Sequence, residues 1–168
     1  MTNSYITMSK IKSKIMANTY HQMYIQAVFA VKYREAVIEK KWKEELFKVV
    51  GNLINETECK TILVNGVEDH VHCFFGLLPK TSVSDVLQNA KAKSSKWINE
   101  SELLNHRFEW QKGFGCFSYS HSHIDKVFKY IQNQEAHHKI ETFRDEYIRM
   151  LKAFAVPYDE KYLFEDLI

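Results

Sequence analysis

The chain has 168 residues, an apolar content of 45% and a formal net charge of only +2 at neutral pH. Its length is typical of one domain, and its apolar share is sufficient for a hydrophobic core. Five glycines and two prolines are too few for a disordered chain. The small net charge does not by itself indicate nucleic-acid binding, so any phosphate-binding surface has to be a local patch.

Signals for export and membrane insertion are lacking in the sequence. Cys59, Cys73 and Cys116 form no CxxC pair and are expected to be reduced thiols of a cytoplasmic protein. The longest apolar stretches are far too short to span a bilayer. Residues 1–16 carry lysines without a following apolar segment, so they are expected to be a flexible leader rather than a signal peptide. We expect one domain over residues 17–168, ending in a helical extension.

The first half of the chain alternates between strand and helix patterns. Residues 20–31 are β-prone and predict a first strand, and apolar residues at helical spacing over 36–56 predict a long amphipathic helix. Residues 59–67 and 70–78 predict a second and a third strand, the latter ended by Pro79.

The second half is mainly helical. Ser82 or Ser84 is expected to cap a helix that runs through Asn99, and a fourth strand is predicted over 116–119 after an irregular segment. Ser122 and Asp125 resemble a capping box at the start of a helix that continues to about Lys139. A final helix is predicted over 142–154.

This order of elements predicts the fold class. The order β-α-β-β-α-β-α-α is typical of an α+β fold, with a ferredoxin-like or RRM-like antiparallel sheet and helices mainly on one face.

Two histidines lie two residues apart in the third predicted strand. Strand side chains alternate between faces, so His70 and His72 point the same way while Val71 points into the opposite layer. Two imidazoles side by side form half of a divalent-metal site. The pattern also arises by chance in satisfied core or surface histidines, and His121 and His123 repeat it where a capping or solvated role is expected.

The predicted helix over 124–139 offers a second group. Tyr130 and Gln134 are four residues apart, on the flank of the apolar stripe that begins at Ile124. We therefore expect them to be neither fully buried nor freely solvated. The alternative is structural, with the tyrosine ring packed on the core and the glutamine present as a helix former.

Together these groups predict chemistry at phosphorus. Two neutral imidazoles and an amide oxygen leave a divalent ion with its full charge and with open positions for phosphate oxygens. A tyrosine held nearby is then oriented to attack the phosphate, and the covalent phosphotyrosine conserves the bond energy so that the strand can be rejoined. Hydrolysis would need no such tyrosine.

Five segments of the chain carry a resemblance to one protein family, and two of them contain its characteristic pattern. The pattern is histidine, bulky apolar residue, histidine on a strand, and then a helix with a tyrosine followed four residues later by a glutamine. The segments are VNGVEDHVHCFFGLLP, SSKWINE, FEWQKGFGCFSYS, KYIQNQEAHH and VPYDEKYLFED. From about Ala17 onward, the chain resembles the single-tyrosine HUH transposases of bacterial insertion sequences, including the REP-associated tyrosine transposases.

The resemblance implies a function. It implies that His70, His72 and Gln134 hold Mg²⁺ or Mn²⁺ and that Tyr130 is the nucleophile. It implies cleavage and rejoining of single-stranded DNA at hairpin-bearing element ends, through a 5′-phosphotyrosine intermediate. It also implies a homodimer; related enzymes complete the active site in trans, which the spacing here does not show.

Cationic residues interleaved with aromatic ones suggest where DNA would bind. Cations that contact the backbone and rings that stack on bases are the usual means of binding single strands. The alternative is an ordinary solvated helix face, with the aromatic rings in the core. The candidate DNA-binding residues are Lys32, Arg34, Lys91, Lys93, Lys96, Arg107 and Lys112.

Two other functional classes stay open on the sequence alone. A non-catalytic module that binds single-stranded nucleic acid would do so without a metal. A metal-dependent phosphodiesterase would hydrolyse the strand, and a Tyr130→Phe variant of it would still cut.

Overall fold

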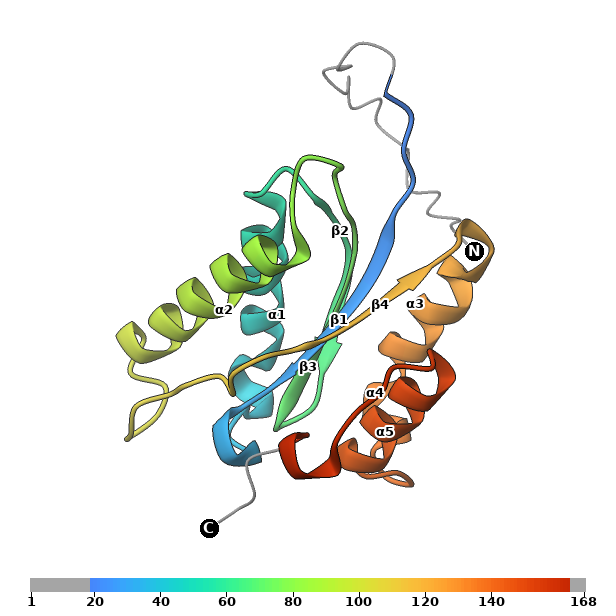
Figure 1. Cartoon of the computed structure of the whole chain (residues 1–168). Coiled ribbons are helices and arrows are strands. Elements are labelled where there is room, and N and C mark those ends of the chain that lie inside the picture. The colour runs from blue at the N-terminus through green and yellow to red at the C-terminus, as the bar shows by residue number, and fades with distance from the viewer. Residues whose placement is uncertain (1–18, 164–168) are drawn as a thin grey trace, which may run out of the picture.

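A computed structural model of the chain describes residues 19–163. In this part of the chain four strands form one antiparallel sheet in the order β2-β3-β1-β4 (Figure 1). This is the ferredoxin-like arrangement, so the predicted α+β class with an antiparallel sheet is confirmed. The predicted leader, residues 1–16, lies outside the described residues. The strands are β1 Tyr24–Ala30, β2 Lys60–Gly66, β3 His70–Gly76 and β4 Gly115–Tyr119.

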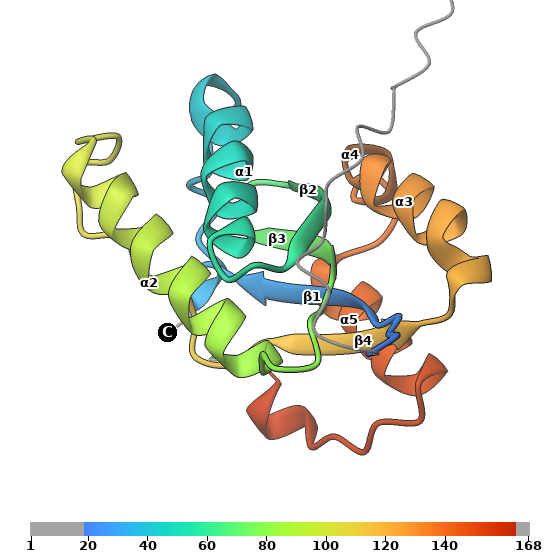
Figure 2. The same ribbon diagram turned by 90° about the horizontal axis from the view of Figure 1, so that it is seen from above.

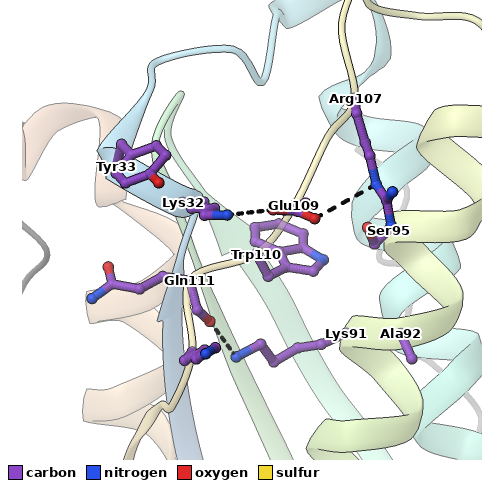
Figure 3. Close-up of a pocket in the computed structure, with 10 residues that line it drawn as sticks. Lys32, Tyr33, Lys91, Ala92, Ser95, Arg107, Glu109, Trp110 and Gln111 are labelled. Atoms are coloured by element: carbon purple, nitrogen blue, oxygen red, sulfur yellow. Dashed lines mark hydrogen bonds and ion pairs between the residues drawn. The ribbon is translucent and has the colours of Figure 1, made fainter.

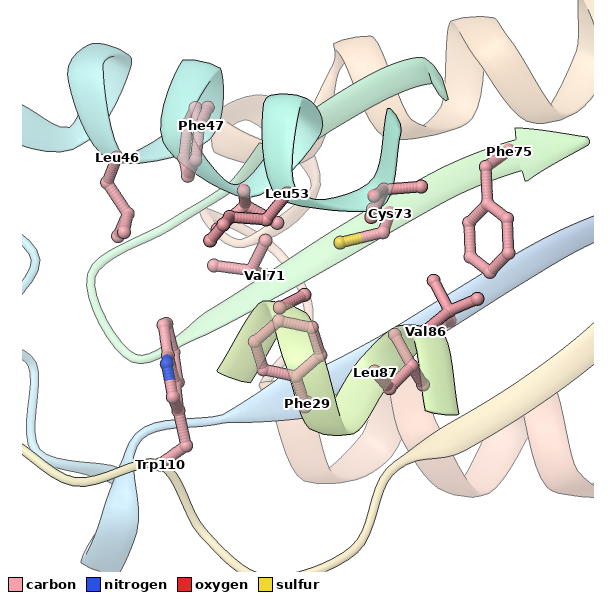
Figure 4. Packing of buried hydrophobic residues seen from close by; sticks show 14 of the residues in the cluster. Phe29, Leu46, Phe47, Leu53, Val71, Cys73, Phe75, Val86, Leu87 and Trp110 are labelled. Carbon is pink, nitrogen blue, oxygen red and sulfur yellow. The ribbon is translucent and has the colours of Figure 1, made fainter. Parts of the chain in front are cut away.

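The two longest described helices, α1 (Lys40–Asn55) and α2 (Val83–Glu100), cover one face of the sheet (Figures 1 and 2). Alternate residues of β1 and β3 point into this layer, among them Phe29, Val71 and Phe75 (Figure 4). Ser82 is the residue that caps α2, because its Oγ accepts a hydrogen bond from the Asp85 backbone at 3.0 Å. The main core therefore lies on the side of the sheet away from the two histidines.

Shorter helices cover the second face. They are α3 (Ile124–Gln132), α4 (Gln134–His137) and α5 (Phe143–Ala153). The sequence predicted helices mainly on one face, and the structure adds this second layer because β1 and β3 bury both of their faces. One apolar cluster joins α3 to Phe74, and another joins α5 to Val28 and Phe117. His70 and His72 lie between these clusters.

The helix predicted over 124–139 is divided. Asn133, at φ −96° and ψ 22°, leaves the helical conformation between α3 and α4. The predicted capping box is also wrong: His123 is the N-cap residue, no side chain caps α3, and Ser122 Oγ lies 2.9 Å from Ser120 Oγ. A 3-10 turn over residues 121–123 starts the helix instead.

The turn between β2 and β3 sets the position of His70. A Cβ atom on Gly66 would lie 2.2 Å from the carbonyl oxygen of His70, so only glycine allows this close approach. The Val67 N–H donates to the same carbonyl at 3.1 Å. Within residues 19–163, no helix has both the length and the apolar character needed to cross a membrane.

Candidate active site

His70 and His72 point to the same side of β3, as the alternation of a strand predicts. Both imidazoles are fully buried, and their ring centroids are 5.1 Å apart. The Nε2 atom of each ring is buried and has no hydrogen-bond partner among the described residues. Because buried polar atoms are normally paired, two such nitrogens side by side indicate a place for a ligand.

Tyr130 of α3 and Gln134 of α4 reach this place from the same chain. The Tyr130 and His72 ring centroids are 6.2 Å apart. Tyr130 is half-buried, as its position on the helix flank predicts, but Gln134 is fully buried, so that prediction is wrong for Gln134. The reason is its contact with α5, where its Nε2 donates to Glu146 at 2.9 Å. Gln134 Oε1 is buried and unpartnered among residues 19–163.

Glu146 of α5 joins the two groups, although the sequence patterns did not predict it. Its Oε1 accepts hydrogen bonds from the Tyr130 hydroxyl and from Gln134. Its Oε2 accepts one from His138 Nε2 at 3.0 Å and lies 3.5 Å from Nε2 of both His70 and His72.

A signal for Glu146 was present in the sequence. An acidic residue in the first turn of a helix is ordinarily a solvated partner of the helix dipole. Glu146 lies three residues after Phe143 and four before Met150, both of which are buried. A carboxylate on the apolar stripe of an amphipathic helix is the unusual feature that marks it.

The surroundings of Glu146 decide its charge and that of Tyr130. Burial raises the pKa of the Glu146 carboxyl, but contacts with His138, His70 and His72 outweigh burial and lower that pKa overall. Burial and the neighbouring Glu146 charge raise the pKa of Tyr130, and Arg149, whose Nη2 donates to the Tyr130 hydroxyl at 3.2 Å, opposes the shift. The site therefore pairs an ionised carboxylate with a protonated phenol.

A divalent ion fits between these groups. One ligand atom from each of His70, His72 and Glu146 lies within 4.8 Å of the others. The 3.5 Å from Glu146 Oε2 to each Nε2 is close to the roughly 3.0–3.5 Å expected between two atoms that bind one ion at about 2.1 Å. Gln134 donates through Nε2 to the same carboxylate, and its Oε1 is buried and unpartnered among the described residues.

Groups behind His70 fix its orientation. Its Nδ1 lies 2.7 Å from Asp69 Oδ1, and Arg34 pairs with the same carboxylate at 3.8 Å. Phe143 of α5 stacks on the imidazole with a centroid distance of 4.0 Å. Since a carboxylate only accepts, the proton is on Nδ1 and the lone pair of a neutral ring is on Nε2.

A cavity of about 870 Å³ lies beside the C-terminal end of β1 (Figure 3). Lys32, Lys91, Arg107 and Lys112 line it, four of the seven residues predicted to bind DNA. Lys32 pairs with Glu109 at 2.6 Å, and Arg107 lies 3.5 Å from the same carboxylate.

The other predicted DNA-binding cations lie elsewhere. Arg34 faces Asp69, Lys93 pairs with Glu56 at 2.7 Å, and Lys96 pairs with Glu100 on its own helix. The aromatic residues interleaved with the predicted cations are Trp97, Phe108, Trp110 and Phe114. For Phe108 and Trp110 the structural alternative is correct, because both are buried and pack edge to face against each other.

The family of the chain follows from a comparison with known proteins. A family model described as "Transposase IS200 like" matches residues 19–134. The chain belongs to the IS200-like transposase family. The match contains His70, His72, Tyr130 and Gln134, and it ends before the helix of this transposase that carries Glu146.

Two solved structures share the fold of this transposase. One is a crystal structure of a protein from Deinococcus radiodurans R1 described as a transposase, with a TM-score of 0.58 and 17% identity over 73% of this chain and 98% of that chain. The other is a REP-associated tyrosine transposase bound to a REP hairpin, with a TM-score of 0.56 and 14% identity over 93% of this chain and 99% of that chain. No curated protein matches this chain.

Replacing Glu146 tests whether its carboxylate holds the transposase site together. In Glu146→Gln, at least two of the buried acceptor contacts are lost, so the free energy of unfolding should fall by about 3 kcal/mol. Urea denaturation with a chelator present measures this. The matched control is Glu141→Gln, which removes the partly exposed carboxylate that pairs with Arg149 and should cost less than about 1 kcal/mol. Equal losses in the two variants would contradict the assignment.

Proposed function

We propose that this transposase is an HUH-type tyrosine enzyme that cleaves and rejoins single-stranded DNA at hairpin-bearing element ends. The single observation that carries the proposal is the meeting of Tyr130 with His70 and His72 in one buried site. The structural likeness to a transposase bound to a REP hairpin supports the choice of hairpin DNA. The cytoplasm, where such DNA is found, is the proposed location.

The metal of the proposal is Mn²⁺ or Mg²⁺. His70 and His72 would hold it through Nε2, Gln134 through Oε1 and Glu146 through Oε2. Imidazole nitrogens together with oxygens suit Mn²⁺ better than Mg²⁺, which prefers oxygen ligands alone. When bound, the ion supplies a positive charge that polarises the scissile phosphate.

The side chains of this chain carry the transfer itself. Tyr130 Oη attacks phosphorus, forming an O–P bond as the P–O3′ bond breaks, which leaves a 5′-phosphotyrosine and a free 3′-hydroxyl. Glu146 Oε1 accepts the hydrogen bond of the phenol and orients Oη for attack, and the phenolic proton ends on the departing O3′. Arg149, 3.2 Å from the phenol oxygen, stabilises the negative charge that develops there. Attack by a new 3′-hydroxyl reverses these steps and rejoins the strand.

The site is complete within one chain in this proposal. Tyr130, Gln134 and both histidines contact Glu146 of the same chain, so completion in trans is not required. A homodimer stays part of the proposal because joining two element ends needs two sites. Each protomer would then contribute one whole site.

A covalent adduct tests the chemistry. Wild-type protein mixed with Mn²⁺ and a 3′-labelled single strand that contains a short hairpin with single-stranded flanks should carry the label on a denaturing gel. Tyr130→Phe and the His70→Ala, His72→Ala double variant should form no adduct, because they lack the nucleophile and the metal ligands. Tyr162→Phe, which changes an exposed tyrosine, is the control and should react normally.

Two outcomes would contradict the chemistry. Strand cutting by Tyr130→Phe would indicate a phosphodiesterase. Metal-independent hairpin binding without cleavage by the wild type would indicate a non-catalytic binding module.

We further propose that the cavity lined by Lys32, Lys91, Arg107 and Lys112 binds the backbone of the DNA strand. Lys32 and Arg107 share one carboxylate, Glu109, so the lining keeps an excess of positive charge. Lys91 has a structural part, because its Nζ donates to the carbonyl groups of Gln111 and Gly113. The segment Lys32–Arg34 connects the cavity to the site, since Arg34 pairs with Asp69 behind His70.

The salt dependence of binding tests this surface. A plot of log K for DNA binding against log salt has a negative slope. Each phosphate contact that is lost should make this slope less steep by about 0.7 for a single strand. Arg107→Gln and Lys112→Gln should each show this change when fluorescence anisotropy measures hairpin binding. Lys93→Gln and Lys96→Gln are the matched controls on α2 and should leave the slope unchanged. A larger effect in the controls would place the strand elsewhere.

A further inference from the structure

The two histidines differ in the group behind each ring. His70 Nδ1 faces the carboxylate of Asp69 at 2.7 Å, whereas His72 Nδ1 faces the side-chain amide of Gln26 at 3.0 Å. A carboxylate can only accept a hydrogen bond, so it fixes the proton of His70 on Nδ1. An amide presents an oxygen or a nitrogen, so it allows either tautomer of His72.

Tyr119 of β4 contacts the oxygen of that amide. Its hydroxyl donates to Gln26 Oε1 at 2.8 Å, and Gln26 Nε2 therefore faces His72. With an N–H donated to Nδ1, a neutral His72 carries its own proton on Nε2, the atom that lies 3.5 Å from Glu146 Oε2. In this tautomer His72 has no lone pair directed toward the site.

The reversed amide gives the opposite result. Gln26 is fully buried on β1, and a half-turn of its amide exchanges oxygen and nitrogen with almost no change in shape. The oxygen then accepts from His72 Nδ1–H, and the amide nitrogen donates to the Tyr119 oxygen. Burial raises the pKa of Tyr119 to about 12, so its hydroxyl stays protonated and serves as donor or acceptor in turn.

We propose that Gln26 and Tyr119 form a hydrogen-bonded switch that sets the tautomer of His72, and that divalent-metal binding is coupled to reversal of the Gln26 amide. The ring loses the proton on Nε2 and gains one on Nδ1, so its charge is unchanged. Gln26 touches no metal and acts through His72, which makes it a positioning residue. The coupling to metal rests on the proposed function, while the tautomer of the metal-free protein does not.

Three variants of the full chain test the switch. Gln26→Met keeps the size of the side chain and removes the acceptor, so Mn²⁺ affinity measured by calorimetry should fall about 10- to 100-fold. Gln26→Glu places a carboxylate oxygen toward His72 and another toward Tyr119, so both can be accepted without rotation of the side chain. The Mn²⁺ affinity of this variant should equal or exceed that of the wild type. Gln88→Met, on the exposed side of α2, is the matched control and should bind like the wild type.

Nitrogen-15 NMR of the imidazoles gives a readout independent of activity. In the metal-free wild type His72 should carry its proton on Nε2, and in Gln26→Glu on Nδ1. Gln26→Glu keeps the test decisive even if Gln26→Met does not fold.

Two results would overturn the switch, and a third would overturn the metal site. An Nδ1 proton on His72 in the metal-free wild type, or an unchanged Mn²⁺ affinity in folded Gln26→Met, would exclude the switch. A wild type that binds no Mn²⁺ would remove the metal site and the coupling with it, whatever the tautomer. The failure of the switch and the failure of the proposed function are thus distinguishable.

Discussion

The carboxylate of Glu146 is the constraint on which the site depends. A buried charge is costly unless hydrogen bonds and opposite charges surround it, and Glu146 is only 1% exposed. Its two oxygens accept hydrogen bonds from side chains of α3, α4 and the segment after α4. Its Oε2 also faces the two imidazoles of β3. Satisfying this one anion therefore brings together side chains that are far apart in the sequence.

The sheet provides the rigid side of this arrangement. β1 and β3 are its central strands, and their alternate side chains form the main core with α1 and α2. The remaining positions of β3 point the other way, so His70 and His72 are held by a backbone that the core has already fixed. α3 and α5 rest on the second face through smaller apolar clusters, which places the phenol of Tyr130 against the imidazoles.

Local patterns in the sequence predicted the strands, the shared face of the histidine pair and a serine cap of α2, with Ser82 and Ser84 as the two candidates. These features depend on alternation and on neighbours within one turn. Glu146, the break at Asn133 and the contact of Gln26 with His72 depend on packing between distant segments. An acidic residue in the first turn of a helix and a polar residue in a strand look solvated when read locally, and only the second helical layer buries them.

Diffraction from crystals of the full chain grown with Mn²⁺ and measured at the manganese edge tests the central claim most directly. The account predicts one anomalous peak per chain, bonded to Nε2 of His70 and Nε2 of His72, with the Tyr130 hydroxyl of that same chain beside it. A manganese peak bound away from the histidines, or histidines that face Tyr130 of another copy, would contradict it.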